Sequence, residues 1–373
     1  MKLLFASDSF KGTLSSEKTI ELLTKAAHDV FGECECSGVP VADGGEGTVK
    51  AVVKARGGKL ITVPVHDPLM ENHFASYGVL SDTEAVLEMA EASGLPLVPE
   101  DKRNPMLATT YGTGELVKAA LDAGYTDLSI AIGGSATNDG GMGFAAALGV
   151  KFYDADGNEL IGRGEDLAKV VRMDVSGIDP RVKDAKITVM CDVTNPLTGP
   201  DGATYTFGAQ KGATPEMQAA LEDGMQNYRR LLIEEFGIDP NETPGTGAAG
   251  GLGAALLLFC GAEMKSGINT VLDLIGFDDR LDGVDLVVTG EGRTDWQSAF
   301  GKVLQGVGER CKAKGIPAVA LCGSLGKDYE KIYECGIQSL LTTVDGCIPL
   351  SEAMERAEEL YYRGAVRLFR FFL

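Results

Sequence analysis

Strands that end in glycine-rich loops, and then lead into helices, recur along this sequence. Clear examples start at residues 37–41, 128–132 and 286–289, and glycines mixed with carboxylate or amide side chains follow each apolar stretch. Alternating strands and helices are typical of α/β proteins with a largely parallel sheet. Ligands of such folds bind beyond the carboxyl ends of the strands. The pattern therefore predicts an α/β fold with its functional site in these loops.

Two further regions complete the predicted fold. Residues 2–8 are predicted to form a buried first strand, and a helix is predicted to begin at Ser15 or Ser16. Two extended runs, 73–80 and 84–90, flank a short polar turn and predict an antiparallel hairpin. The middle of the chain is therefore expected to contain a mixed sheet.

Length and charge limit the classes of function. The chain has 373 residues, which at roughly 150 residues per domain predicts about two domains. Its net charge of −20 disfavours nucleic acids and anionic membrane surfaces as partners. The N-terminal residues MKLLFASDSF reach an acidic residue after a very short apolar stretch, which argues against an export signal. We therefore expect a globular cytoplasmic protein that acts on neither nucleic acids nor membranes.

The glycine-rich loops have the composition of phosphate sites that share a cation. Glycine lets the backbone approach a ligand, and amides at the following helix N-terminus point at an anion. Carboxylates beside such amides would repel a phosphate unless the carboxylate and the phosphate oxygens bound the same Mg²⁺ ion. Asp192, after the predicted strand 186–191, could be a metal ligand or a general base. Cations within the loops could neutralise a substrate carboxylate or a transferring phosphoryl group; they are Lys11, Lys211, Arg293 and Lys302.

Several familiar motifs are absent or lack their structural context. Residues 245–250 match the dinucleotide fingerprint GxGxxG, but residues 240–244 cannot form the strand that must precede it. We therefore interpret this run as a glycine-rich entry into a helix near residues 252–260. Neither GxxxxGK[ST] nor GxSxG occurs, so an ordinary P-loop protein and a serine hydrolase are not predicted.

The cysteines and histidines show no spacing typical of metal ligands. The eight cysteines contain no CxxC pair, so neither a zinc site nor dithiol redox chemistry is predicted. Cys34 and Cys36 are the one close pair, and alternate positions would point both side chains to one face of a strand. His28, His66 and His73 are widely separated. We expect reduced thiols that act mainly as small hydrophobic residues.

Taken in order, the loop motifs resemble the bacterial glycerate kinase family, type 1, over essentially the whole chain. The resemblance rests on DSFK at 8–11, PVADGGEGT at 40–48, TYGTGE at 110–115, the run 133–141, CDVTNPL at 191–197, the run beginning at Gly245, and TGEGRTDWQ at 289–297.

This resemblance implies an activity and a domain arrangement. The activity is transfer of the γ-phosphoryl group of ATP to D-glycerate with Mg²⁺, and we favour the 2-phospho product over the 3-phospho product. The resemblance also implies two α/β domains separated by a cleft. One is a Rossmann-like domain with a mainly parallel sheet, built from both chain ends (residues 1–70 and 285–373). The other is an inserted α/β domain with a mixed sheet (residues 71–284).

The family resemblance and the loop chemistry together suggest roles for particular residues. Lys11 and Arg293 would hold the substrate carboxylate or the transferring group. Asp43 or Asp192 would accept the hydroxyl proton or bind Mg²⁺, and the division of roles between these two acids stays open. Asp295 is, with Asp192, a candidate metal ligand. The expected phosphate contacts are Gly133, Gly134, Ser135, Asn138, Gly290 and Gly292.

Two other classes of function stay open from the sequence. A nicotinamide-dependent oxidoreductase that acts on a small hydroxy acid would depend on the GxGxxG match at residues 245–250. A non-catalytic binding module would need no carboxylates beside its phosphate loops, so their repeated presence argues against that class.

Overall fold

The computed structural model describes residues 1–373, which divide into two compact units. The terminal unit comprises residues 1–43, 54–56 and 266–373, and the inserted unit comprises residues 44–53 and 57–265. The predicted α/β class is confirmed, with one unit built from both chain ends around a parallel sheet and the other around a mixed sheet. The division differs from the predicted ranges in that residues 44–53 and 57–70 belong to the inserted unit and residues 266–284 to the terminal unit.

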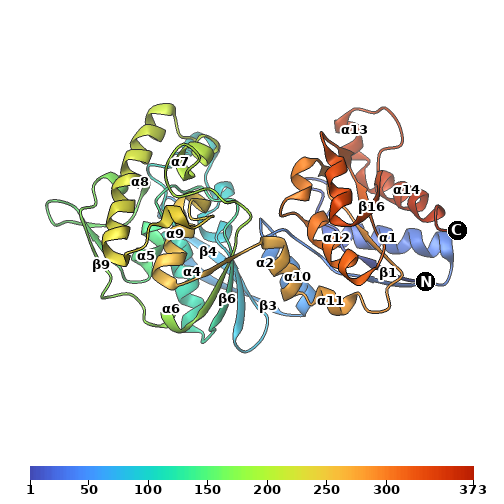
Figure 1. Ribbon diagram of the computed structural model, residues 1–373, viewed down its shortest axis with the longest axis horizontal. Coiled ribbons are helices and arrows are strands. Elements are labelled where there is room, and N and C mark those ends of the chain that lie inside the picture. The colour runs from blue at the N-terminus through green and yellow to red at the C-terminus, as the bar shows by residue number, and fades with distance from the viewer. The chain divides into compact units, whose positions relative to one another are not determined.

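A five-stranded parallel sheet forms the centre of the terminal unit (Figure 1). Its order is β16-β14-β12-β1-β2, and every neighbouring pair is parallel. The chain thus lays down β2 on one side of β1 and the remaining strands on the other. The strands are β1 (Lys2–Phe5), β2 (Glu35–Gly38), β12 (Leu286–Thr289), β14 (Ala318–Cys322) and β16 (Ile337–Thr342).

Helices flank this sheet and bury its apolar residues. Alternate strand residues such as Leu3 and Phe5 face a core shared with α1 and α14, which lie side by side (Figure 1). Ser15 caps α1 by accepting a hydrogen bond from the Lys18 amide, so the predicted helix start is confirmed. The helices are α1 (Ser16–Phe31), α10 (Gly267–Leu274), α11 (Phe277–Arg280), α12 (Val303–Lys314), α13 (Leu350–Glu355) and α14 (Ala357–Arg370).

The inserted unit contains a six-stranded mixed sheet in the order β11-β10-β6-β5-β4-β3. The predicted hairpin is confirmed, because β4 and β5 pair antiparallel, while β5, β6, β10 and β11 are parallel. The strands are β3 (Lys59–His66), β4 (Asn72–Val79), β5 (Glu84–Glu88), β6 (Asp127–Ala131), β10 (Lys186–Met190) and β11 (Glu263–Lys265). A separate small sheet contains β7 (Lys151–Tyr153), β8 (Glu159–Leu160) and β9 (Arg172–Asp174).

Helices enclose one large apolar core in this unit. They are α2 (Thr48–Arg56, whose last residues belong to the terminal unit), α3 (Ala90–Ser93), α4 (Tyr111–Asp122), α5 (Met142–Ala147), α6 (Arg181–Asp184), α7 (Ala203–Phe207), α8 (Pro215–Phe236) and α9 (Ala248–Cys260). None of the helices in the chain combines the length and the apolar character needed to cross a bilayer.

Candidate active site

The strand order of the terminal unit determines where a ligand can bind. Strands β1 and β12 are neighbours in the sheet. The chain continues from β1 to β2 on one side of this pair and from β12 to β14 on the other, so the carboxyl ends of β1 and β12 form a topological switch point. The loop after β1 contains Asp8 and Lys11, and the loop after β12 contains Glu291 and Arg293. The hydrogen bonding between β1 and β12 continues beyond the strand ends, because the Asp8 amide donates to the Gly290 carbonyl at 2.9 Å. The first residues of the two loops are therefore fixed to each other.

A cavity of about 840 Å³ opens at this edge. Its lining combines three carboxyl groups, on Asp8, Asp43 and Glu291, with three cationic groups, on Lys11, Arg293 and Lys302. An apolar wall is added by α13 and α14, including Leu350, Met354 and Tyr361. The size is typical of a small-molecule site, and the mixture of charges suits an anionic ligand bound together with a cation.

Asp8 has the most perturbed carboxyl group of this cavity. Burial, and then the negative charge of Asp43, raises the pKa of Asp8 to about 7, although the Ser9 amide and Lys11 act in the opposite direction. The Ser9 amide donates to Asp8 Oδ1 at 2.6 Å. A carboxyl group that titrates near neutrality can exchange a proton with a substrate hydroxyl.

Glu291 is held in place by residues behind the cavity wall. It is 6% exposed, and Ser298 donates a 2.5 Å hydrogen bond to Oε1. Burial raises the pKa of Glu291, against the hydrogen bonds from Ser298 and Thr294. The short parallel pair β13 (Arg293–Thr294) and β15 (Ser324–Leu325) holds the loop after β12 beside the loop after β14. This pairing gives the cavity a fixed wall.

The structure places the predicted residues of the terminal unit in and around this cavity. Asp43, Lys11, Arg293 and Gly292 line it. Gly290 lies at the end of β12, where an added Cβ would stand 2.1 Å from the Leu321 carbonyl oxygen, so the close packing of the loop requires glycine.

Asp295 lies next to these lining residues. Its Oδ1 accepts from the Gln297 amide at 3.0 Å, and its Oδ2 lies 3.7 Å from Arg293 Nε. Asp295 therefore already has two partners, a helix cap and an ion pair, which a metal ion would have to share.

The remaining predicted residues lie at the carboxyl edge of the inserted sheet. Met190 of β10 is in register with Ala131 of β6, so the loops that contain Asp192 and Gly133 leave from neighbouring positions. Gly133 and Gly134 are exposed, as is Asp192. The loop is held from the side, because the Leu95 amide donates to the Gly134 carbonyl at 2.8 Å and Ser135 forms a β-bridge with Gly94. Exposed backbone on a fixed loop suits an anion.

The polar side chains that follow Ser135 point into the protein. Asn138 is fully buried and donates to Thr204 Oγ1 at 3.0 Å. Asp139 is also fully buried and accepts from both the amide and the hydroxyl of Thr110 at 2.7 Å. Burial raises the pKa of Asp139, against these hydrogen bonds. These side chains fix the shape of the loop from beneath.

Lys211 completes this buried frame. Its Nζ donates to the Thr137 carbonyl at 2.7 Å, and the side chain is 2% exposed. Burial lowers the pKa of Lys211 to about 7, opposed by the negative charge of Asp139. Lys211, a cation predicted to neutralise a ligand, is thus bonded to the backbone of the loop.

The GxGxxG run at residues 245–250 packs against the loop that contains Asn138. No strand precedes it, and residues 240–242 form a 3-10 turn. Gly250 has a positive φ of 68°, its carbonyl accepts from the Gly140 amide at 2.9 Å, and an added Cβ would lie 2.1 Å from the Thr137 carbonyl oxygen. The run therefore packs against residues 137–140 at the start of α9, as the interpretation of a helix entry predicts.

Sequence reasoning assigned no role to Asp8, Glu291 or Glu88. Asp8 and Glu291 each stand two or three residues after a buried strand, a signal that could have selected them. Glu88, the last residue of β5, accepts from the Gly47 and Val49 amides at 3.2 and 2.5 Å and so caps α2. Burial raises the pKa of Glu88 to about 6, against these amides. Its partner lies 39 positions away, so spacing alone could not reveal it.

Comparisons with known proteins agree with one another. The model of the glycerate kinase family matches residues 3–373. A glycerate kinase of Bacillus subtilis strain 168 is 45% identical over 366 residues, covering 98% of this chain and 96% of that protein. A glycerate 2-kinase of Escherichia coli K12 is 44% identical with the same coverage. A crystal structure from Salmonella typhimurium LT2, named provisionally as glycerate kinase 2, has a TM-score of 0.89 at 40% identity, covering 100% of this chain and 98% of that one.

Proposed function

Because the chain belongs to the glycerate kinase family it is a phosphotransferase that acts on glycerate, and we propose that ATP is its donor and the 2-hydroxyl of D-glycerate its acceptor. The name of the Escherichia coli relative, glycerate 2-kinase, supports this choice of hydroxyl.

The observation that carries the proposal is the charged cavity at the switch point of the terminal sheet. Phosphoryl transfer requires positioning and charge neutralisation more than covalent catalysis. The cavity provides cations for a carboxylate or a phosphoryl group, from Lys11, Arg293 and Lys302. It also provides Asp8, whose pKa near 7 suits proton transfer.

We assign the acceptor side of the reaction to the terminal unit. Lys11 and Arg293 hold the glycerate carboxylate or the transferring group, and both side chains are exposed at the cavity. Asp8 joins Asp43 as a candidate to accept the proton of the attacking hydroxyl. Burial, and then the negative charge of Asp43, raises the pKa of Asp8, which suits Asp8 to accept this proton near neutral pH.

We assign phosphate contacts to main-chain amides. The exposed backbone of Gly133 and Gly134, with Ser135 beside it, would cradle the phosphates of ATP from the inserted unit. Gly290 and Gly292 would do so at the end of β12. Asn138 supports the loop through Thr204 and thereby positions these amides.

The residues present fit Mg²⁺. The carboxyl oxygens of Asp8, Asp43 and Glu291 line one cavity, and oxygen ligands are those that Mg²⁺ prefers. Burial, and then repulsion from Asp43, raises the pKa of Asp8, and a bound cation would offset that repulsion. When bound, Mg²⁺ would neutralise phosphate charge. Asp192 and Asp295 remain further candidate ligands.

An assay of ATP consumption with D-glycerate and Mg²⁺ tests the proposal, and phosphorus NMR of the product locates the new phosphate. We expect turnover that depends on all three components and a 2-phospho product. A 3-phospho product would overturn the regiochemistry alone. Turnover with another nucleoside triphosphate but not with ATP would overturn the choice of donor.

A further inference from the structure

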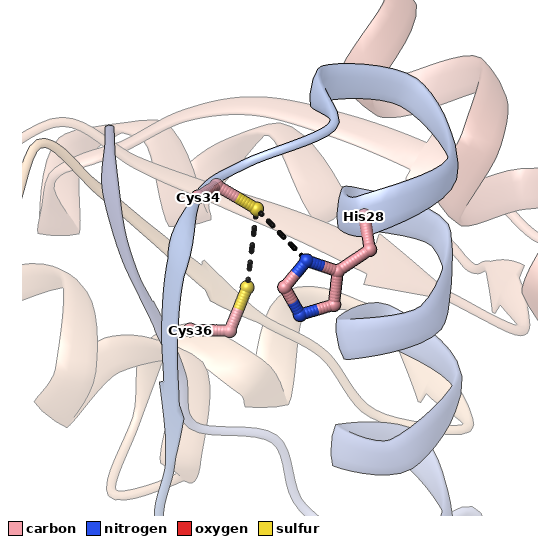
Figure 2. Close-up of side chains that lie close together, drawn as sticks. All are labelled: His28, Cys34 and Cys36. Carbon is pink, nitrogen blue, oxygen red and sulfur yellow. Dashed lines mark hydrogen bonds between the residues drawn. The ribbon is translucent and has the colours of Figure 1, made fainter.

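The end of α1 and the start of β2 bring together a histidine and two cysteines that have no part in the proposed reaction. His28 lies in the last turn of α1, and Cys34 and Cys36 flank the first residue of β2. Figure 2 shows the three side chains turned toward one another, the imidazole from the helix and both thiols from the strand segment. The sequence predicted no metal ligands here, because the residues do not form a CxxC pair and the third side chain is supplied by a different element.

The distances between the candidate ligand atoms suit tetrahedral coordination. Cys34 Sγ lies 3.6 Å from Cys36 Sγ and 3.6 Å from His28 Nδ1. With Zn–S near 2.3 Å and Zn–N near 2.0–2.1 Å, a tetrahedral zinc ion separates two sulfurs by about 3.8 Å and sulfur from nitrogen by about 3.6 Å. All three ligand atoms lie within 4.8 Å of one another. A metal ion could therefore bind with only small side-chain movements.

We propose that His28, Cys34 and Cys36 form a binding site for Zn²⁺, with the fourth coordination position open to solvent. Two thiolates and an imidazole are a donor set that selects zinc over Mg²⁺, which prefers oxygen. The site opens into a surface depression of about 680 Å³ whose lining includes Glu33, Glu35 and Asp285, and these carboxylates attract cations. His28 is exposed and both cysteines are partly so, which gives an ion access.

Zinc binding requires that the cysteine thiols lose their protons. Burial, and then the neighbouring Cys34, raises the pKa of Cys36 to about 12. Without metal the Cys36 thiol is therefore protonated at neutral pH, and zinc must displace its proton. Lys2 also lines the depression but pairs with Glu35 at 3.9 Å and donates to the Asp282 carbonyl at 2.9 Å, so its charge is partly offset.

This site is separate from the cavity of the proposed reaction. Glu35 is in register with Lys2 at the amino edge of the sheet, whereas Asp8 follows the carboxyl end of the same strand. The three steps from Lys2 to Phe5, at about 3.3 Å each, separate the two edges by roughly 10 Å. Zinc would cross-link the end of α1 to the start of β2, so we expect it to stabilise the terminal unit rather than take part in phosphoryl transfer.

The test is a metal titration of the full chain kept fully reduced by a phosphine. Co²⁺ is used as a spectroscopic probe, and Zn²⁺ affinity is measured by competition with a chromophoric chelator. We expect one equivalent to bind, an intense thiolate-to-cobalt charge-transfer band, d–d bands typical of tetrahedral cobalt, and a higher Tm with zinc.

Three variants decide the outcome. Cys36→Ser removes one of two thiolate ligands, so it should at least halve the charge-transfer band and weaken zinc binding by at least the roughly tenfold to 100-fold that loss of a supporting partner costs. His28→Gln, at an exposed position, gives a second test in case Cys36→Ser folds poorly. Cys335→Ser removes a half-buried thiol outside the cluster and should bind zinc as the parent chain does. Equal zinc affinity of the parent chain, Cys36→Ser and His28→Gln would overturn the proposal, as would no binding by the reduced parent chain.

Discussion

The two candidate regions differ in where their charged side chains lie. In the terminal unit, Lys11 and Arg293 are exposed at the cavity, and Asp8 and Asp43 are partly so. In the inserted unit, Asp139 and Lys211 are buried beneath the loop and bonded to its neighbours or its backbone. The first region offers charged groups to a ligand, whereas the second uses them to shape exposed main chain.

This difference has an energetic meaning. An exposed charged group stays hydrated in the folded protein and contributes little to the free energy of unfolding, and it can change partners. Its removal should therefore alter catalysis more than stability. A buried charged or polar group that loses its partner keeps its desolvation cost, so its removal should alter stability first. Variants of matched chemistry in the two regions can test this separation.

The largest effect is expected from Asp43→Asn in the terminal cavity. Loss of a carboxylate that accepts a proton or binds the metal should lower kcat by about 10²–10⁴-fold, while the free energy of unfolding changes little. Steady-state assays and urea unfolding measure the two quantities. Asp82→Asn, at an exposed turn, is the matched control and should leave kcat unchanged. A near-normal kcat for Asp43→Asn would remove Asp43 from the mechanism.

The next effect is a pH dependence set by Asp8. Its pKa is raised to about 7, so below pH 7 the group becomes protonated and can no longer accept a proton. We expect kcat/KM, which reports the groups of the free enzyme, to fall about tenfold per pH unit on the acid side. In the residual activity of Asp43→Asn this limb should move to lower pH, because a neighbouring negative charge is gone. A limb that stays in place would show that another group controls it.

The sequence predicted the fold and much of the terminal cavity, because strand ends can be recognised locally. The loop residues Asp43, Lys11, Arg293 and Gly292 follow from the pattern of strand, glycine and charge. The sequence did not reveal which charged residues are buried. Lys11 and Lys211 both stand near glycines, yet only the structure separates the exposed cation from the one bonded to Thr137.

Those two lysines provide a matched pair for the third prediction. Lys211→Met leaves the Thr137 carbonyl without its donor and should reduce the free energy of unfolding by about 1–3 kcal/mol. Lys11→Met, at an exposed position, should change it by less than about 0.5 kcal/mol but lower activity. Urea unfolding of both variants measures the difference. Equal stability of the two variants would contradict the separation of roles.

Lys211 should also make the free energy of unfolding depend on pH. The pKa of Lys211 falls from an ordinary 10.5 to about 7 on folding, so between these values the unfolded chain binds more protons than the folded one. Stability of the parent chain should therefore rise with pH across this window, relative to Lys211→Met. Identical pH profiles for the two proteins would show that Lys211 does not have the predicted low pKa.

The smallest effect is expected at the cap of α2. Glu88 accepts hydrogen bonds from the Gly47 and Val49 amides, and glutamine keeps only one acceptor oxygen while its amide nitrogen would face an N–H donor. Glu88→Gln should therefore cost about 1 kcal/mol and speed hydrogen exchange at the Val49 amide. Glu46→Gln, an exposed change in the same loop, is the control and should leave that amide protected. If exchange at Val49 is equally slow in both variants, the buried carboxylate does not hold the loop, and the inserted unit positions its main chain by other contacts.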